Sequence, residues 1–198
     1  MYGIISLIEA YNSIFHYDLI AISETFLNES IKNDDIFMEG FSKEIFRSDH
    51  PNGKKEGEVC LYFKENLAIK RRKDLEIHQE TVICEIAIRR KKIFFIVTYR
   101  SPNQNDREFD LFHDNLQVTI DNIKDTKPHC IIVTGDLNCR SKQWWSGDID
   151  SREGIMLDEL IESNNLVQLI DEPTNIESRG ISCVDLIITD QPNLFIDY

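Results

Sequence analysis

Asp136 and Asn138 lie in a Gly-Asp-Leu-Asn string that directly follows an apolar stretch at positions 130–134. Residues two apart in an extended chain point to the same side, so these two side chains would face one site together. The carboxylate could hold a water or a magnesium-bound oxygen, and the amide could donate a hydrogen bond to a phosphate oxygen. The alternative is an Asx turn that ends a strand, because Gly, Asp and Asn are common turn residues.

Other candidate residues also stand at the ends of apolar stretches. Glu24 closes the apolar run 18–23, Tyr99 and Arg100 end another strand-like run, and Asp185 opens a third. A carboxylate at a strand end suits the ligand site of an α/β protein, and a phenol beside a guanidinium suits a phosphate. Each residue has an ordinary alternative, because isolated polar groups at strand ends are usually solvated.

Hydropathy patterning predicts the elements that must position these residues. Apolar residues recur every three or four positions over three segments, which predicts helices at 1–15, 107–123 and 152–163. Strands are expected at 18–23, 40–47, 57–64, 67–70, 81–89, 93–99, 130–134, 166–170 and 184–189. We expect the middle third to be an antiparallel meander, the strand at 18–23 to be buried, and the whole chain to form one domain of mixed sheets flanked by helices.

Composition bounds the possible partners. The chain has 198 residues with 22 Lys and Arg against 35 Asp and Glu, a formal net charge of −13. Basic clusters at 70–73 and 89–92 could bind a DNA backbone, but we favour solvated hairpin turns because no aromatic residue interleaves them. The five cysteines form no Cys-x-x-Cys pair and are expected to be buried. No membrane span and no targeting signal is seen, so an intracellular location is expected.

The order of the polar strings along the chain is more informative than any one string. In sequence order they are Ser23-Glu24-Thr25, Tyr99-Arg100-Ser101-Pro102, Gly135-Asp136-Leu137-Asn138, Glu172-Pro173-Thr174 and Ser182-x-x-Asp185. This ordered set resembles the endonuclease/exonuclease/phosphatase superfamily, and within it the endonuclease domains of non-LTR retrotransposons. The resemblance extends over nearly the whole chain.

The resemblance implies a deoxyribonuclease-like fold, a four-layer αββα sandwich of two mixed, mostly antiparallel sheets with the active site at one rim. It implies cleavage of phosphodiesters with magnesium, or manganese in its place. The implied metal ligands are Glu24 and Asp185. Asp136 would orient or deprotonate the attacking water, Asn138 and Tyr99 would contact the scissile phosphate, and Asp185 would also support the catalytic hydrogen bonds. The implied substrate-binding residues are Arg100, Ser101, Thr174 and Ser182.

The chain also departs from the superfamily pattern. Relatives begin with a strand that carries an Asn near the metal and end with a Ser-Asp-His string. We therefore expect the domain at 1–198 to be incomplete at both ends, without its first and last strands, and to have impaired activity. The Ser-Asp-His string at 48–50 lies where relatives carry a loop, and we interpret it as coincidental.

Three functions are compatible with the sequence. The leading hypothesis is a metal-dependent DNA endonuclease that nicks target DNA for retrotransposition, with a reverse transcriptase domain of the same polyprotein as its partner and a nuclear location. The second is a catalytically silent remnant that at most binds DNA or protein. The third is a phosphatase or phosphodiesterase of the same superfamily, acting on inositol phosphates or sphingolipids.

Overall fold

The computed structural model describes residues 16–49, 57–177 and 180–195, so the helix predicted at 1–15 lies outside the described residues. The strands are β1 (Leu19–Ser23), β2 (Phe46–Ser48), β3 (Val59–Phe63), β4 (Ile69–Arg71), β5 (Thr81–Ile88), β6 (Lys91–Thr98), β7 (Cys130–Asp136), β8 (Val167–Gln168), β9 (Asn175–Glu177), β10 (Gly180–Ser182) and β11 (Asp185–Thr189). The helices are α2 (Asp106–Asp125) and α3 (Arg152–Ser163), with 3₁₀ turns η1 (Asn33–Ile36), η2 (Lys73–Leu75) and η3 (Pro192–Leu194).

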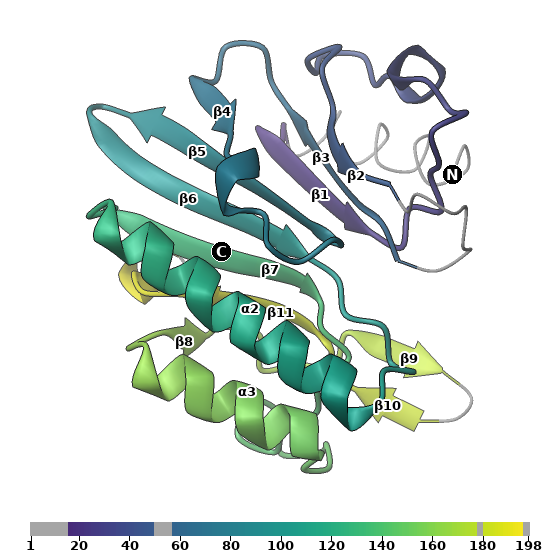
Figure 1. The fold of residues 1–198 in the computed structure, drawn as a ribbon, viewed down its shortest axis with the longest axis vertical. Coiled ribbons are helices and arrows are strands. Elements are labelled where there is room, and N and C mark those ends of the chain that lie inside the picture. Colours follow the sequence, from purple (N-terminus) through teal and green to yellow (C-terminus); the bar gives the residue numbers. More distant parts are fainter. Residues whose placement is uncertain (1–15, 50–56, 178–179, 196–198) are drawn as a thin grey trace.

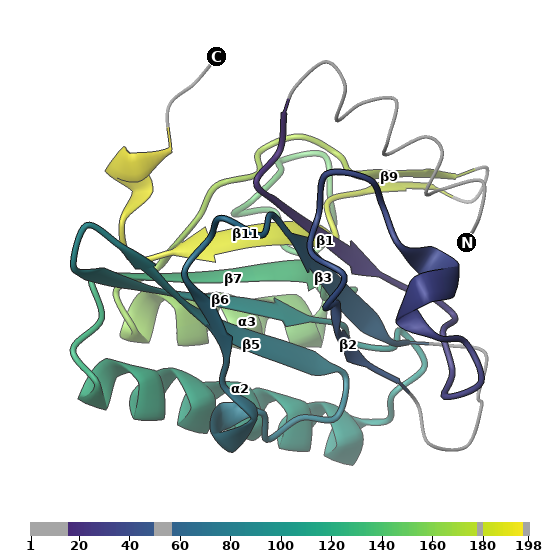
Figure 2. The same cartoon turned by 90° about the horizontal axis from the view of Figure 1, so that it is seen from above.

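Two sheets are stacked face to face, with helices on one outer side (Figures 1 and 2). The larger sheet has six strands in the order β4-β5-β6-β7-β11-β8, and the smaller has the order β1-β3-β2. Helices α2 and α3 cover one face of the six-stranded sheet, and the three-stranded sheet covers its other face. Among the described residues, the outer face of the three-stranded sheet is covered by the loop at 27–45. The predicted α/β sandwich of two mostly antiparallel sheets is confirmed. The six-stranded sheet is mixed, because β6 and β7 pair in parallel, and the three-stranded sheet is antiparallel throughout.

Strand β6 shows why an unbroken apolar run becomes the centre of this sandwich. Its residues alternate in direction, so Phe94 and Ile96 pack under the helices while Phe95 and Val97 face the three-stranded sheet. A strand covered on both faces needs apolar residues at every position. The chain then runs through α2 to β7, which pairs in parallel with β6, and the crossover helix covers the sheet.

Two expectations for the strands are corrected. The middle third is not one meander, because β2 and β3 join the three-stranded sheet whereas β4, β5 and β6 join the other. Tyr62 and Cys60 of β3 are buried against the loop at 27–45, which holds β3 away from β4. Strand β1 is half-exposed and not buried, because among the described strands it pairs only with β3.

The apolar interior is large and its thiols are free. All five cysteines are buried and unbridged, as expected. Burial raises the pKa of the Cys60, Cys84 and Cys139 thiols to about 12. Of the helices in the described part of the chain, none is long and apolar enough to cross a membrane.

Candidate active site

The predicted site residues meet at one rim of the two sheets. Strand β1 ends at Ser23, β6 at Thr98 and β7 at Asp136, and β11 begins at Asp185 at the same rim. Asp136 and Asp185 are direct partners in the antiparallel register of β7 and β11. The topology therefore brings together side chains from both sheets that lie far apart in sequence.

A side-chain hydrogen bond joins the two sheets at this rim. The Tyr99 hydroxyl donates to Oε1 of Glu24 over 2.9 Å, from a tyrosine that is 1% exposed. Burial, and then the hydrogen bond to Glu24, raise the pKa of Tyr99, so the phenol stays a proton donor at neutral pH. Glu24 is exposed and has a φ of 53°, a left-handed backbone conformation that turns its carboxylate out of β1.

Asp136 carries the most perturbed carboxyl of the rim. Burial, and then the charges of Asp185 and Glu24, raise its pKa to about 7. The backbone N–H of Asn138 donates to Oδ1 of Asp136 over 3.1 Å and partly opposes this shift. A carboxyl that titrates near neutrality can accept a proton from water at physiological pH.

Gly135 allows β7 to reach the end of β6. Its φ is 143°, and a Cβ built there would lie 1.9 Å from the carbonyl oxygen of Thr98. After this close approach Asn138 adopts a φ of 48°, and its Nδ2 donates to the carbonyl oxygen of Arg100 over 2.9 Å. An amide nitrogen has two N–H groups, so this bond orients Asn138 and leaves a second donor for a phosphate.

Arg100 holds the site together from beneath, which corrects its predicted role in substrate binding. The side chain is 3% exposed, and its guanidinium donates to the carbonyl oxygens of Leu137, Asn138 and Ser101. It also lies over the ring of Phe109, 5.4 Å from its centroid. Its donors face backbone carbonyls in the interior, so it fixes the loop after β7.

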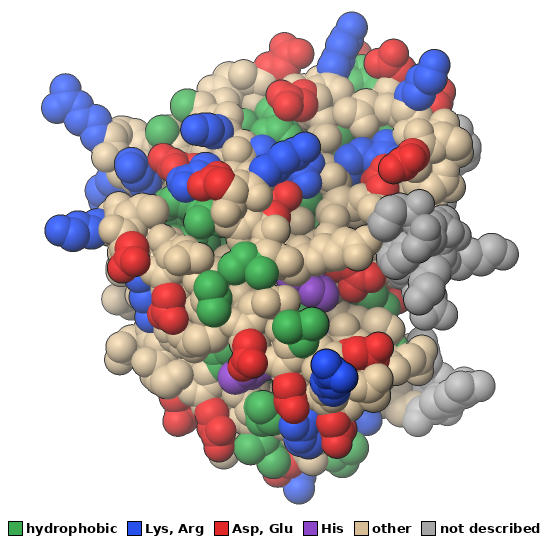
Figure 3. All heavy atoms as spheres, viewed as in Figure 1, with side chains coloured by type: hydrophobic (Ala, Val, Ile, Leu, Met, Phe, Trp, Pro, Cys, Tyr) green, Lys and Arg blue, Asp and Glu red, His purple; other side chains and the backbone are tan. Residues whose placement is uncertain are grey.

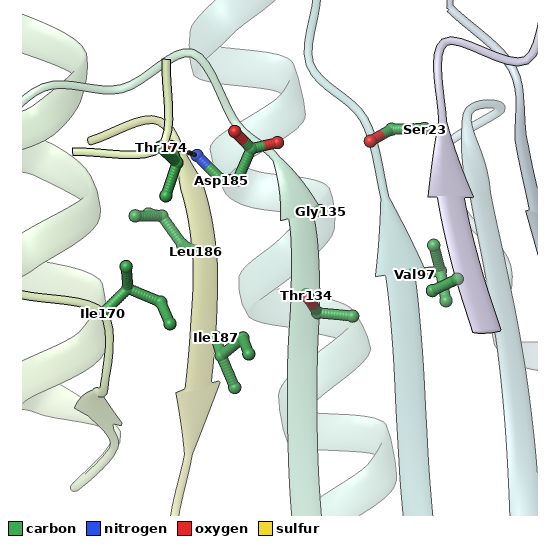
Figure 4. Close-up of a pocket in the computed structure, with 10 residues that line it drawn as sticks. Ser23, Val97, Thr134, Gly135, Ile170, Thr174, Asp185, Leu186 and Ile187 are labelled. Carbon is green, nitrogen blue, oxygen red and sulfur yellow. Dashed lines mark hydrogen bonds between the residues drawn. The ribbon is translucent and has the colours of Figure 1, made fainter. Parts of the chain in front are cut away.

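The other predicted substrate-binding residues differ in what they contact. The Thr174 hydroxyl accepts from the backbone N–H groups of Val184 and Asp185 over 3.1 and 3.0 Å, so it sets the start of β11 (Figure 4). Ser182 is 8% exposed within the β9–β10 hairpin beside it. Ser101 is half-buried and caps the turn after β6 by accepting from the backbone N–H of Asn103.

A pocket of about 250 Å³ opens beside these residues, between β1 and β11. Ser23 lines it from the three-stranded sheet, and Thr174 and Asp185 line its mouth from the other side (Figure 4). Its deeper wall is apolar and includes Val97 and Ile187. The rim is therefore concave next to the carboxylates, as a ligand site requires.

Sequence patterns gave no signal for the Arg140–Asp148 ion pair. Arg140 Nε donates to a carboxylate oxygen of Asp148, which is 3% exposed. The other oxygen of Asp148 accepts from the backbone N–H of Cys183 over 2.9 Å, two residues before Asp185. Asp148 thus connects the loop after β7 to the start of β11, and only the folded topology shows this connection.

The donor chemistry of the rim fits magnesium. Glu24, Asp136 and Asp185 supply hard oxygen atoms, and burial, followed by the charges of Asp185 and Glu24, raises the pKa of Asp136. Within the described ranges, however, no three or more Asp, Glu, His or Cys side chains form a ready cluster of metal ligands. The three carboxylates share one rim but do not enclose an ion by themselves. Magnesium commonly uses only one or two carboxylates together with substrate oxygens.

Neither basic cluster offers free cations at this rim. Arginines of the first cluster are held in ion pairs, and the second cluster lies at the opposite end of the sheet. Arg71 and Arg72 form ion pairs with Glu76 and Glu85 at 2.9 and 2.8 Å. The cluster at 89–92 forms the β5–β6 turn, at the end of β6 opposite the site and roughly 25 Å along the strand. Lysine and arginine side chains gather over that turn in Figure 3. The hairpin-turn interpretation is confirmed for this second cluster.

Comparison with known proteins supports the fold and identifies the family. The family model for endonuclease-reverse transcriptase matches residues 93–196, and no curated protein matches the chain. Among solved structures, the endonuclease domain of TRAS1, a telomere-specific non-LTR retrotransposon, is 19% identical over 96% of this chain and 80% of its own, with a TM-score of 0.71. The AP endonuclease LMAP from Leishmania major is 15% identical over 93% and 73%, with a TM-score of 0.75.

The same fold also carries other chemistry. A mannosyl-6-phosphatase from Bacteroides thetaiotaomicron is 10% identical over 93% of this chain and 75% of its own, with a TM-score of 0.61. At such identities these likenesses show a shared fold, not a shared substrate. The family match itself spans more than half of the chain. The chain therefore belongs to the endonuclease-reverse transcriptase family, within the endonuclease/exonuclease/phosphatase superfamily.

Proposed function

We propose that this chain is a metal-dependent endonuclease that hydrolyses phosphodiester bonds of DNA and nicks one strand at a target site for retrotransposition. The observation that carries the proposal is the joint position of Asp136, with a pKa raised to about 7, and the Tyr99–Glu24 hydrogen bond at one rim. A base near neutrality and a phenol donor in one place suit attack of water on a phosphate.

Each residue has a distinct role in this proposal. Glu24 and Asp185 would hold magnesium or manganese, which when bound neutralises charge on the phosphoryl oxygens. Asp136 takes a proton from the attacking water. The free amide N–H of Asn138 orients the phosphate, and the Tyr99 hydroxyl positions the Glu24 carboxylate through its hydrogen bond, so that the water attacks in line with the leaving oxygen.

An exposed aromatic side chain favours a nucleic acid over a small phosphate ester. Phe26 is 55% exposed, two residues after Glu24, whereas its neighbours Thr25 and Leu27 are 3% and 1% exposed. The buried neighbours fix the loop, so the Phe26 ring projects from it into solvent. A base or sugar beside the scissile phosphate could stack on this ring. The family description further supports a reverse transcriptase domain of the same polyprotein as partner, and hence a nuclear location.

Nicking of supercoiled plasmid with magnesium tests the proposal. We expect wild type to produce open circles, and Glu24→Gln and Asp136→Asn each to slow this by about 100-fold or more. Asp114→Asn, an exposed acid on α2, is the matched control and should nick like wild type. Nicking that neither rim change slows would contradict the proposal. A wild-type chain that magnesium stabilises against heat but that does not nick would favour the silent alternative.

A further inference from the structure

A buried carboxylate that the proposed reaction does not use lies beside Glu24. Glu58 precedes β3, and the register of β1 and β3 places it next to Glu24, with the Thr25 backbone N–H 3.4 Å from the Glu58 carbonyl oxygen. The Glu58 residue is 1% exposed. Neither of its carboxylate oxygens makes a hydrogen bond of ordinary geometry within the described residues. The backbone N–H of Phe26 lies near enough to lower the Glu58 pKa in part.

A second carboxylate lies near Glu58, and the neighbouring Thr25 carries an unpartnered hydroxyl. Gly57 has a φ of 104°, and a Cβ built there would lie 2.3 Å from Oε1 of Glu80. The Glu80 carboxylate therefore occupies the space that a side chain at position 57 would need. Thr25 is 3% exposed, and its hydroxyl likewise has no hydrogen-bond partner within 16–49, 57–177 and 180–195. The two carboxylates therefore lie near one another, and the unpartnered hydroxyl belongs to the residue whose backbone N–H faces the Glu58 carbonyl oxygen.

No described basic residue forms an ion pair with Glu58. Burial, and then the charges of Glu80 and Asp49, raise the pKa of Glu58. His78 Nε2 lies 3.7 Å from the Glu80 carboxylate, and the Arg47 guanidinium is already paired with Asp49. Burial of an unpaired carboxylate is unfavourable, so such groups are commonly protonated, paired with a base or bound to a metal.

We infer that Glu58 and Glu80, with the Thr25 hydroxyl, bind a divalent cation at a second site, separate from the proposed magnesium site at Glu24. All donors are hard oxygen atoms, which suit magnesium, manganese or calcium. The group holds fewer than three acidic, histidine or cysteine ligands, in keeping with the absence of a larger cluster from the described residues. Water would complete the coordination shell. The inference does not depend on nuclease activity.

Manganese binding to the chelator-treated chain tests this second site. Equilibrium dialysis should show that Glu58→Gln and Glu80→Gln each bind a single ion fewer per chain than wild type. Glu65→Gln, at the far end of β3, is the matched control and should bind as wild type does. In a Glu24→Gln background, which removes the proposed catalytic ligand, manganese at a hundredfold excess over its dissociation constant should raise the melting temperature by roughly 5–10 °C. Adding Glu58→Gln should abolish that rise.

The outcomes separate a cation site from a protonated carboxyl. An unchanged number of bound ions in Glu58→Gln and Glu80→Gln would overturn the inference, even if the metal-free Glu58→Gln chain melts higher than wild type. A melting rise that persists in the Glu24→Gln and Glu58→Gln double variant would overturn it as well. Should Glu58→Gln fail to fold, Glu80→Gln carries the same test, because its side chain is 17% exposed and its change disturbs the interior less.

Discussion

The two walls of the candidate active site differ in how their polar groups are satisfied. In the wall from the six-stranded sheet, Asp136 accepts from the backbone of Asn138, Thr174 accepts from the backbone of Asp185, and Arg100 donates to three carbonyls. All of these hydrogen bonds join protein groups to one another and need no ligand. This wall therefore has a defined geometry before any ligand arrives.

The wall from the three-stranded sheet is strained and undersatisfied. Glu24, Phe26 and Glu58 have φ values of 53°, 53° and 57°, and such conformations cost roughly 1–3 kcal/mol each. The carboxylate of Glu58 and the hydroxyl of Thr25 have no hydrogen-bond partner among the described residues. In the proposed reaction the first wall would orient the phosphate, whereas the second wall would bind cations through its carboxylates.

Removing the Asp148 carboxylate should have the largest effect, because it breaks the well-satisfied wall. Asp148→Ala leaves Arg140 without its partner and the backbone N–H of Cys183 without its acceptor. We expect a loss of about 3–5 kcal/mol in the free energy of unfolding, measured with urea. Asp158→Ala, which removes a half-buried acceptor of Trp144 on α3, is the comparison and should cost about 1 kcal/mol. Equal losses would show that the wall has no special dependence on Asp148.

The pH dependence of stability should report the raised pKa of Asp136. The Asp136 pKa is raised to about 7 from 3.8, so the folded chain keeps a proton that the unfolded chain has released. The free energy of unfolding should therefore fall as pH rises from about 4 to about 7, by at most about 1.4 kcal/mol per unit from this group. Unfolding with urea in the presence of chelator measures this slope. Asp136→Asn should flatten this slope. An unchanged slope in that variant would show that another group causes the pH dependence.

Loss of the Tyr99–Glu24 hydrogen bond, which joins the two walls, should lower stability by an intermediate amount. Tyr99→Phe removes the hydroxyl that donates to Glu24 and should cost about 2 kcal/mol of stability, because the acceptor is charged. It should also slow plasmid nicking. Tyr62→Phe is the matched control, since its hydroxyl donates to the carbonyl oxygen of Ile36 inside the three-stranded side. That variant should lose about 1 kcal/mol and keep its nicking rate. Equal nicking by both variants would refute a role for the Tyr99 hydroxyl.

The smallest effect is expected at the exposed ring of the strained wall. Phe26→Ala should leave the free energy of unfolding nearly unchanged, because the side chain is 55% exposed. It should weaken DNA binding by about 1 kcal/mol, roughly fivefold in KM, with little change in kcat. Phe37→Ala, at an aromatic that is 37% exposed after η1, should alter neither constant. A KM that does not respond to Phe26→Ala would remove stacking from the proposed substrate contacts.

Local signals account for what the sequence predicted well. Asn105 and Glu108 form a capping box at the start of α2, and Ser151 caps α3, so both helices begin within one residue of their predicted positions. The apolar run of β6 was equally readable, because a strand buried on both faces needs no alternation. Short-range chemistry and periodicity were enough for these elements.

Long-range pairing accounts for what the sequence did not predict. Arg100 was predicted to bind phosphate because a guanidinium at a strand end suits an anion. In the folded chain, three backbone carbonyl oxygens accept its hydrogen bonds instead. The partners of Asp148 lie 8 and 35 residues away, at Arg140 and Cys183, and no periodic pattern connects them. Division of the middle strands between two sheets depends on packing against the loop at 27–45, which also lies outside local patterning.

The buried free thiols give the two halves of the molecule built-in reporters. Cys60 lies within β3 of the small sheet, and Cys139 directly follows Asn138 beside the large one. Both are 0% exposed, so an alkylating reagent reaches each only when its own surroundings open. Mass spectrometry of the labelled peptides would then time the opening of each half separately in the unaltered chain.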